Sequence, residues 1–193
     1  MQHLPASGAY ILTVNHLNTL DAFFIVSALT LRTKRMPHFM AKFANLGSWY
    51  EKAVVQGWAN CIPMHKPYDE KNKERCLMLA LEYLKQGEVV GIFPESQRNL
   101  EPYLLKGKTG AVRLALWAKA PVVPIGYFGP LTTSHWKTIF RIVFLGERPR
   151  IKIGQPVYFD EYYDREINQQ LLNEMTRKIM LGISHQLGRP YPH

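Results

Sequence analysis

Apolar residues recur along the chain with two spacings, and each spacing predicts a different kind of element. Short runs rich in β-branched and aromatic residues are typical of buried strands, and the first such run covers residues 9–14. Longer segments repeat an apolar residue at helical spacing, as Leu77, Leu81 and Leu84 do within 69–86. That spacing puts the apolar side chains on one face, so 69–86 is predicted to be an amphipathic helix.

Predicted strands and helices alternate through most of the chain. The predicted strands are 9–14, 36–42, 58–64, 88–93, 122–127, 139–145 and 150–153. The predicted helices are 20–31, a short one within 43–55, 69–86, 111–119 and 164–187. Because such alternation produces parallel strands joined by crossover helices, we expect an α/β fold with a mainly parallel central sheet flanked by helices. The strands 139–145 and 150–153, which follow a loop over 129–137, are expected to pair antiparallel at the sheet edge. The tail 188–193 is expected to be loose.

Composition narrows the class of protein. With 193 residues the chain is long enough to bury a core, and we expect a single domain over 1–193. Its 47% hydrophobic and 20% charged residues exclude a disordered chain. Since no run of about 18 or more apolar residues is present, we expect no membrane-spanning helix. Two cysteines, Cys61 and Cys76, do not make a disulfide framework and favour a reducing, cytoplasmic compartment.

A histidine and an aspartate, His16 and Asp21, lie where the first predicted strand ends and the first predicted helix begins. Open α/β sheets form their sites at such strand ends. A carboxylate on one imidazole nitrogen would fix the tautomer and leave the other nitrogen free as a base. The pair alone also fits a solvated turn, in which Asp21 only stabilises the helix N-terminus. The seven histidines show no metal-ligand spacing, so no metal site is predicted.

A second polar stretch follows the predicted strand 88–93, and with the first it forms an ordered set of motifs. In chain order the set is Asn15-His16 with Asp21, Gly57 with Ile62-Pro63-Met64-His65-Lys66, Phe93-Pro94-Glu95 with Arg98, and Val122-Val123-Pro124-Ile125. This set resembles the motifs of the glycerolipid acyltransferase family, whose best-known members are the 1-acyl-glycerol-3-phosphate acyltransferases. The resemblance extends from about Tyr10 to Tyr127, and it implies a glycerolipid acyltransferase-like fold.

The resemblance also implies roles for individual residues. His16 is implied as the catalytic base and Asp21 as the residue that holds it. The residues implied to bind substrate are Asn15, Lys66, Glu95, Arg98 and Lys108. Lys66 stands where the family usually has an arginine, and a lysine holds a phosphate only as a point charge. The acyl donor is implied to be a substrate, acyl-CoA or acyl carrier protein, and no cofactor is implied.

One part of the second motif departs from the family pattern. Ser96 and Gln97 stand where the family commonly has glycine and threonine, and Asn99 stands where it has serine. Losing the glycine restricts the backbone at that position, so we expect a differently shaped loop. The departure bears on the identity of the acyl acceptor more than on the class of reaction.

The net charge of +9 points to an anionic partner. Nucleic acid, an anionic membrane surface and small acidic molecules all fit such a charge. No nucleic-acid motif is present, so we expect no nucleic-acid partner. The densest basic cluster is Arg32, Lys34 and Arg35, which together with exposed aromatic residues is a candidate for docking on a membrane. We expect a cytoplasmic protein that is peripheral on the inner membrane face.

The resemblance implies an acyltransferase that moves a fatty acyl group to the hydroxyl of a lysophospholipid, with 1-acyl-glycerol-3-phosphate as the first candidate and phosphatidic acid as the product. Glycerol-3-phosphate and other lyso-lipids remain alternative acceptors. A hydrolase of thioesters or lipids could use the same His16–Asp21 pair to activate water. A lipid-binding protein without catalysis would keep its function when both residues are lost.

Overall fold

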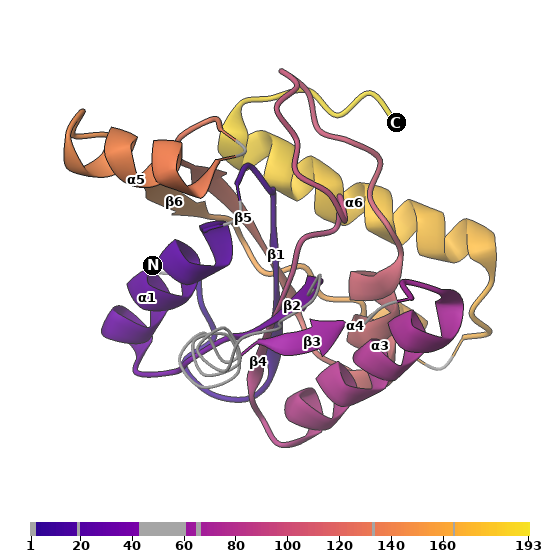
Figure 1. Cartoon of the computed structure of the whole chain (residues 1–193). Coiled ribbons are helices and arrows are strands. Elements are labelled where there is room, and N and C mark those ends of the chain that lie inside the picture. The colour runs from indigo at the N-terminus through magenta and orange to yellow at the C-terminus, as the bar shows by residue number, and fades with distance from the viewer. Residues whose placement is uncertain (1–2, 19, 43–60, 65–66, 133, 164) are drawn as a thin grey trace.

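The computed structural model describes residues 3–18, 20–42, 61–64, 67–132, 134–163 and 165–193. The short helix predicted within 43–55 and the first residues of the strand predicted over 58–64 lie outside them. The described strands form one sheet in the order β3-β2-β4-β1-β5-β6 (Figure 1). They are β1 (Tyr10–Val14), β2 (His38–Lys42), β3 (Ile62–Met64), β4 (Val89–Ile92), β5 (Val122–Phe128) and β6 (Arg150–Ile153). Neighbouring strands pair parallel except β6, which is antiparallel to β5, so the predicted fold class is confirmed.

Helices cover both faces of this sheet (Figure 1). The described helices are α1 (Asp21–Thr33), α3 (Glu70–Lys85), α4 (Gly110–Ala118), α5 (His135–Val143) and α6 (Gln169–Leu187). The helices α3, α4 and α6 share one apolar core with one face of the sheet, and α1 packs on the other face. On α6, the predicted inward residues Leu172, Met175, Ile179 and Ile183 are all buried.

The strand β1 lies between β4 and β5, and all of its side chains are buried. A strand covered on both faces needs an unbroken apolar run, which explains why 9–14 does not alternate between apolar and polar residues. Because β1, β4 and β5 are parallel, their carboxyl ends Val14, Ile92 and Phe128 meet at the same edge of the sheet. The loops that follow these three residues therefore converge.

The two outer strands are short and carry features that suit an edge. The strand β3 contains Pro63, which cannot donate a hydrogen bond to a further strand, and its predicted edge position is confirmed. On β6, Arg150 and Lys152 are exposed, while Ile151 and Ile153 are half-buried.

Two predictions in the C-terminal part are wrong, the strand over 139–145 and the loose tail over 188–193. Residues 139–145 were expected to form a strand, but most of them lie in α5, which also takes the last residues of the loop expected over 129–137. The Ser134 side chain accepts a hydrogen bond from the Lys137 N–H and caps this helix. The apolar, β-branched run favours a strand locally, but the cap and the helical spacing of its apolar residues favour the helix.

The tail 188–193 is bound to the body of the protein rather than loose. The Leu104 N–H donates to the Pro190 carbonyl at 3.0 Å, and the Gly107 N–H donates to the Tyr191 hydroxyl at 3.4 Å. These bonds hold the segment that follows the second motif, because Leu104 and Gly107 lie between that motif and α4.

Candidate active site

The imidazole of His16 lies directly after β1 and is held by the first residue of α1. Its Nδ1 is 3.0 Å from Oδ2 of Asp21. The His16 side chain is 21% exposed, whereas that of Asp21 is fully buried. No described residue forms a hydrogen bond with Nε2 of His16. The pair predicted from the sequence is therefore in contact, with one ring nitrogen bonded to the carboxylate and the other available to a substrate.

The Asp21 carboxylate is fixed by the backbone of the loop it closes. Its Oδ2 also accepts from the N–H groups of Leu17 at 2.5 Å and Asn18 at 2.8 Å. Its Oδ1 is buried, and the buried Tyr127 hydroxyl lies beside this carboxylate. Burial and the nearby Asp21 charge both raise the pKa of Tyr127 above its ordinary value. The backbone donors fix the position of this carboxylate oxygen, so Asp21 is placed to orient the imidazole.

An aromatic ring supports the imidazole from the neighbouring strand. Phe93, the residue after β4, stacks on His16 with a centroid separation of 4.2 Å and an angle of 17° between the ring planes. The Phe93 ring in turn contacts Phe39 of β2, with centroids 5.1 Å apart. Phe39 is fully buried, and its ring fills the space above Gly91. These rings leave the imidazole little freedom to tilt.

The loop after β4 is tied to the His16 loop through Glu95. Its Oε1 accepts from the His16 N–H at 3.3 Å, and its Oε2 accepts from the Leu105 N–H at 2.9 Å and from Asn99 Nδ2 at 2.5 Å. The Asn99 N–H returns a bond to the His16 carbonyl at 2.7 Å. Burial raises the pKa of Glu95, and these hydrogen bonds lower it in part. Glu95 is only 3% exposed and joins the two motifs.

Ser96 stands where the family commonly has glycine, but it keeps the backbone conformation that glycine would favour. Ser96 has a φ of 60°, in the left-handed region. The chain therefore keeps the turn with a residue that adopts it at a cost of about 1 kcal/mol. Asn99, in the place of the usual serine, also accepts from the Glu101 N–H at 2.9 Å. Ser96 keeps the conformation that glycine would adopt, and the expectation of a differently shaped loop stays a prediction.

The remaining predicted substrate-binding residues occupy different positions. Asn15 is buried and clamps β1 to β5, because its Nδ2 donates to the Tyr127 carbonyl at 3.0 Å and its Oδ1 accepts from the Tyr127 N–H at 2.7 Å. Arg98 and Lys108 are exposed, and the Lys108 N–H donates to the Pro94 carbonyl at 2.9 Å. Lys66 lies outside the described residues.

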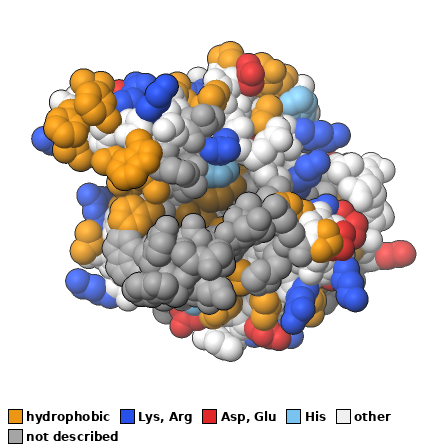
Figure 2. Space-filling view, viewed as in Figure 1, with side chains coloured by type: hydrophobic (Ala, Val, Ile, Leu, Met, Phe, Trp, Pro, Cys, Tyr) orange, Lys and Arg blue, Asp and Glu red, His pale blue; other side chains and the backbone are white. Residues whose placement is uncertain are grey.

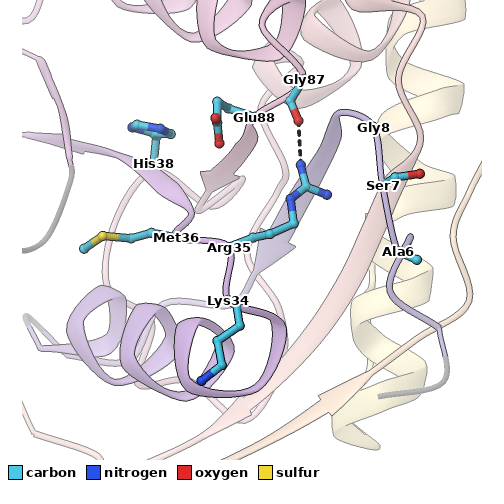
Figure 3. Close-up of a pocket in the computed structure, with 9 residues that line it drawn as sticks. All are labelled: Ala6, Ser7, Gly8, Lys34, Arg35, Met36, His38, Gly87 and Glu88. Atoms are coloured by element: carbon cyan, nitrogen blue, oxygen red, sulfur yellow. Dashed lines mark hydrogen bonds between the residues drawn. The ribbon is translucent and has the colours of Figure 1, made fainter.

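The basic cluster after α1 lies at the opposite edge of the sheet from His16. A hollow of about 530 Å³ opens there, lined by Lys34 and Arg35 among others (Figure 3). The Arg35 guanidinium donates to the Gly87 carbonyl at 2.5 Å and lies over the Tyr10 ring. Arg35 is therefore part of the scaffold, while Lys34 points away from this contact.

Sequence reasoning missed three residues that shape the site: Phe93, Asn99 and Asn18. Phe93 was noted only as a motif position, yet its ring supports the imidazole. Asn18 donates from Nδ2 to the Pro130 carbonyl at 3.2 Å and accepts from the Leu20 N–H at 2.9 Å. All three lie within or beside the two motifs. Their nearness in sequence to His16 and Glu95 was therefore the signal that could have identified them.

The chain is similar to acyltransferases in each comparison with known proteins. The family model described as "Acyltransferase" matches residues 1–128. The 1-acyl-sn-glycerol-3-phosphate acyltransferase of Bacillus subtilis is 31% identical over 166 residues, which cover 81% of this chain and 71% of that protein. The human 1-acyl-sn-glycerol-3-phosphate acyltransferase alpha is 28% identical over 130 residues, 64% of this chain and 42% of its own length. The chain thus spans less than half of the human relative.

A solved structure has the same fold. It is the 1-acyl-sn-glycerophosphate (LPA) acyltransferase PlsC from Thermotoga maritima, with a TM-score of 0.61 and 19% identity, covering 95% of this chain and 68% of that one. The family match and the Bacillus subtilis relative establish that the chain belongs to the Acyltransferase family. It is an acyltransferase enzyme. In the part of the chain that the structure describes, no helix has the length and apolar character to span a bilayer.

Proposed function

We propose that this enzyme transfers a fatty acyl group from acyl-CoA or acyl carrier protein to the free hydroxyl of 1-acyl-sn-glycerol-3-phosphate, forming phosphatidic acid. The observation that carries the proposal is the His16–Asp21 contact of 3.0 Å at a partly exposed imidazole. The similarity to the Bacillus subtilis enzyme supports this acceptor over the alternatives. The proposal places the enzyme in phospholipid synthesis.

The imidazole provides the general base in this proposal. Nε2 of His16 takes the proton of the acceptor hydroxyl as its oxygen attacks the thioester carbonyl carbon. The resulting tetrahedral oxyanion collapses, the C–S bond breaks, and the leaving thiolate takes the proton from the imidazolium. Asp21 holds the ring orientation and stabilises the imidazolium between these two steps. The enzyme needs no nucleophile of its own, because the acceptor attacks directly.

The cations near the second motif bind the acceptor phosphate in this proposal. Arg98 follows Pro94 in the second motif and is exposed, and the exposed Lys108 donates its N–H to the Pro94 carbonyl. Lys66 is the third cation predicted to bind the phosphate. Arginine offers a planar pair of donors to phosphate, and the lysines add point charges. We assign Glu95 and Asn15 to positioning instead, because their polar atoms bond to the backbone of the His16 loop and of β5.

We further propose a peripheral location on the cytoplasmic side of a membrane, and the chemistry of the substrates supports binding to a membrane surface. Both acceptor and product are lipids with anionic headgroups, and the protein carries a net charge of +9. A basic protein concentrates at such a surface, where its acceptor is also found.

The decisive experiment measures thiol release from an acyl-CoA with and without 1-acyl-glycerol-3-phosphate and identifies the lipid product. We expect release that depends on the acceptor and yields phosphatidic acid. His16→Ala should lower kcat by about 100-fold or more. His185→Ala is the matched control, because His185 is exposed on α6, and it should leave kcat unchanged.

Other outcomes of this assay would assign a different function. Release of free fatty acid without an acceptor would identify a hydrolase. Activity only with glycerol-3-phosphate or another lyso-lipid would change the acceptor and keep the mechanism. If acyl-CoA is inert, the same assay with acyl carrier protein as donor tests the second donor class. Absence of transfer with both donors and all acceptors would refute the proposal.

A further inference from the structure

The helix α5 turns its apolar side chains outward. Trp136 is 78% exposed, Phe144 is 72% and Val143 is 64%. Among the α5 side chains that the structure describes, only Thr138 is fully buried. A helix on a folded domain normally buries its apolar stripe. We call the exposed residues Leu131, Trp136, Ile139, Phe140, Val143, Phe144 and Leu145 the α5 patch.

The patch is continuous and built on a well-defined helix. The Phe140 and Phe144 rings stack with centroids 5.1 Å apart. Ser134 caps the start of the helix, and Arg141 in its last turn donates to Glu147, which lies past the helix end, at 2.7 Å. Figure 2 shows apolar side chains gathered over α5 with basic side chains beside them. An exposed apolar patch of this kind marks a binding surface.

The charges around the patch indicate its partner. Between residues 131 and 150 the chain has four cations and one carboxylate, Glu147. Glu147 is paired with Arg141, while Lys137, Arg148 and Arg150 are exposed. Aromatic residues inside a rim of Lys and Arg match the layered chemistry of an anionic bilayer, with acyl chains under negative headgroups. A second copy of the chain would bring the same cations against one another.

The patch lies on the same side of the protein as the candidate active site. The loop from β5 to α5 bonds to the His16 loop, because Asn18 Nδ2 donates to the Pro130 carbonyl at 3.2 Å. The helix α5 therefore starts at the carboxyl edge of the sheet (Figure 1). His16 follows β1 and Glu95 follows β4, so both lie at the same edge. A surface that met a bilayer through α5 would bring this edge, and not the edge with Arg32 and Lys34, close to the lipid.

We propose that the α5 patch docks the enzyme on an anionic bilayer, with Trp136, Phe140 and Phe144 inserted among the acyl chains and the basic rim on the headgroups. The docked enzyme then receives its lipid acceptor directly from the membrane. The proposal rests on the proposed function only in the identity of that acceptor, since the docking itself follows from the exposed residues.

The test compares a patch variant with a control that loses two exposed apolar residues elsewhere on the protein. The patch variant is Phe140→Ser/Phe144→Ser. The control is Met78→Ser/Leu181→Ser on α3 and α6, where the two side chains are 46% and 40% exposed. Binding is measured by co-sedimentation with phosphatidylcholine vesicles, with and without phosphatidylglycerol. We expect the patch variant to lose about tenfold or more in partitioning and the control to match wild type.

A fluorescence measurement reports on insertion itself. Binding of the wild type to phosphatidylglycerol-containing vesicles should shift tryptophan emission to shorter wavelength, and Trp136→Phe should remove most of the shift while binding persists. A shift that survives in Trp136→Phe would overturn the insertion of α5. Equal vesicle binding by wild type and the patch variant would overturn docking by the patch.

Further readouts separate this proposal from the proposed function. The patch variant should keep wild-type kcat on a short-chain, monomeric lysophosphatidate and lose activity on acceptor embedded in vesicles. If the wild type transfers to no acceptor, yet the patch variant alone loses vesicle binding, the docking proposal stands and the proposed function fails. If the wild type is a dimer by analytical ultracentrifugation and the patch variant a monomer, a second copy covers the patch and the docking proposal fails.

Discussion

At the scale of single residues, the candidate site depends on one carboxylate oxygen. Oδ2 of Asp21 accepts from Nδ1 of His16 and from the backbone N–H groups of Leu17 and Asn18. The same atom therefore shapes the loop and orients the imidazole. Few other side chains in the protein could be replaced with so direct a consequence for the chemistry.

Replacing Asp21 by asparagine should lower kcat by about 100-fold or more. The asparagine keeps the shape of the side chain but cannot stabilise an imidazolium, and its amide nitrogen cannot accept from the backbone donors. The steady-state kcat with acyl-CoA and lysophosphatidate provides the measurement. Asp69→Asn is the control, because Asp69 caps α3 and asparagine caps equally well. An Asp21→Asn variant with undiminished kcat would contradict the role assigned to the carboxylate.

Ser96→Gly should raise the free energy of unfolding by about 1 kcal/mol. Ser96 adopts a φ of 60°, where a Cβ is unfavourable and glycine is not. Urea denaturation measures the change. Ser96→Ala keeps the Cβ and should give no gain, so a stabilised Ser96→Ala variant would show that backbone strain is not the cause.

Glu95→Gln should reveal the raised pKa of Glu95 through the pH dependence of stability. Burial raises this pKa above its ordinary value of 4.5. As the pH rises from 4.5 through the raised value, the unfolded chain releases the proton more readily than the folded one. The unfolding free energy of wild type, relative to Glu95→Gln, should therefore fall across this window and stay level above it.

Urea denaturation of both chains at a series of pH values measures that difference. The variant should also be less active at every pH, because one glutamine oxygen cannot accept from His16, Leu105 and Asn99 together. A relative stability of wild type that rises with pH would contradict the raised pKa.

At the scale of elements, strands β2 and β4 support the imidazole through a row of rings. Phe39 on β2 contacts Phe93 after β4, and Phe93 stacks on His16. The row begins at Gly91, where an added Cβ would lie 2.5 Å from the Phe39 ring. The packing between two strands thus reaches His16, the proposed catalytic base.

Gly91→Ala should lower the free energy of unfolding by about 1–3 kcal/mol through this overpacking. It should also lower kcat, because a displaced Phe39 pushes Phe93 against His16. Gly91→Ala combined with Phe39→Leu makes room for the new methyl group and should recover part of the kcat. Denaturation and steady-state kinetics of both variants provide the measurements. If the double variant recovers stability but none of the lost kcat, the rings do not position His16.

Much of the architecture and the central pair of residues could be predicted from the sequence. The strands β1, β4 and β5 are short buried apolar runs, and such runs are clear signals. His16 and Asp21 were identifiable because they follow the first of these runs. The expected contact between them required only that a helix begin at once after the loop, and α1 begins at Asp21.

Other features depended on packing that a sequence does not display. Residues 139–145 were predicted to form a strand because the run is apolar and β-branched. Most of them lie in α5, where the apolar side chains are exposed, so the usual link between apolar character and burial fails there. Glu95 was assigned to substrate, but its oxygens bond to donors from His16 and Leu105, the latter ten residues further along the chain. Three-dimensional proximity of this kind is invisible in the linear order of residues.

At the scale of the whole molecule, the two edges of the parallel sheet have different surroundings. The carboxyl edge carries His16, Glu95 and the start of α5, and the amino edge carries Arg32, Lys34 and the hollow beside Arg35. The sequence suggested that the cluster after α1 would meet the membrane. In the structure that cluster is on the side away from His16, and Arg35 is engaged with Gly87.

Charge neutralisation at the two edges should therefore affect membrane binding unequally. Lys137→Gln/Arg148→Gln, beside the α5 patch, should weaken binding to phosphatidylglycerol-containing vesicles by about fivefold per charge at low salt. Arg32→Gln/Lys34→Gln should have a much smaller effect, because those charges lie at the opposite edge of the sheet and salt screens interactions over about 10 Å. Vesicle co-sedimentation at several salt concentrations tests this. A larger loss in the second variant would reverse the proposed orientation.

The two outer strands of the sheet carry features that discourage pairing with a strand of another copy, which matters if many copies gather on one membrane. Enzymes that gather on a surface become crowded, and an open strand edge would then recruit a neighbour's strand and begin an aggregate. Here one edge holds Pro63, and the other is antiparallel and carries exposed Arg150 and Lys152. Like charges and a missing donor discourage the joining of sheets, so we expect copies docked side by side on a membrane, as proposed, to stay separate.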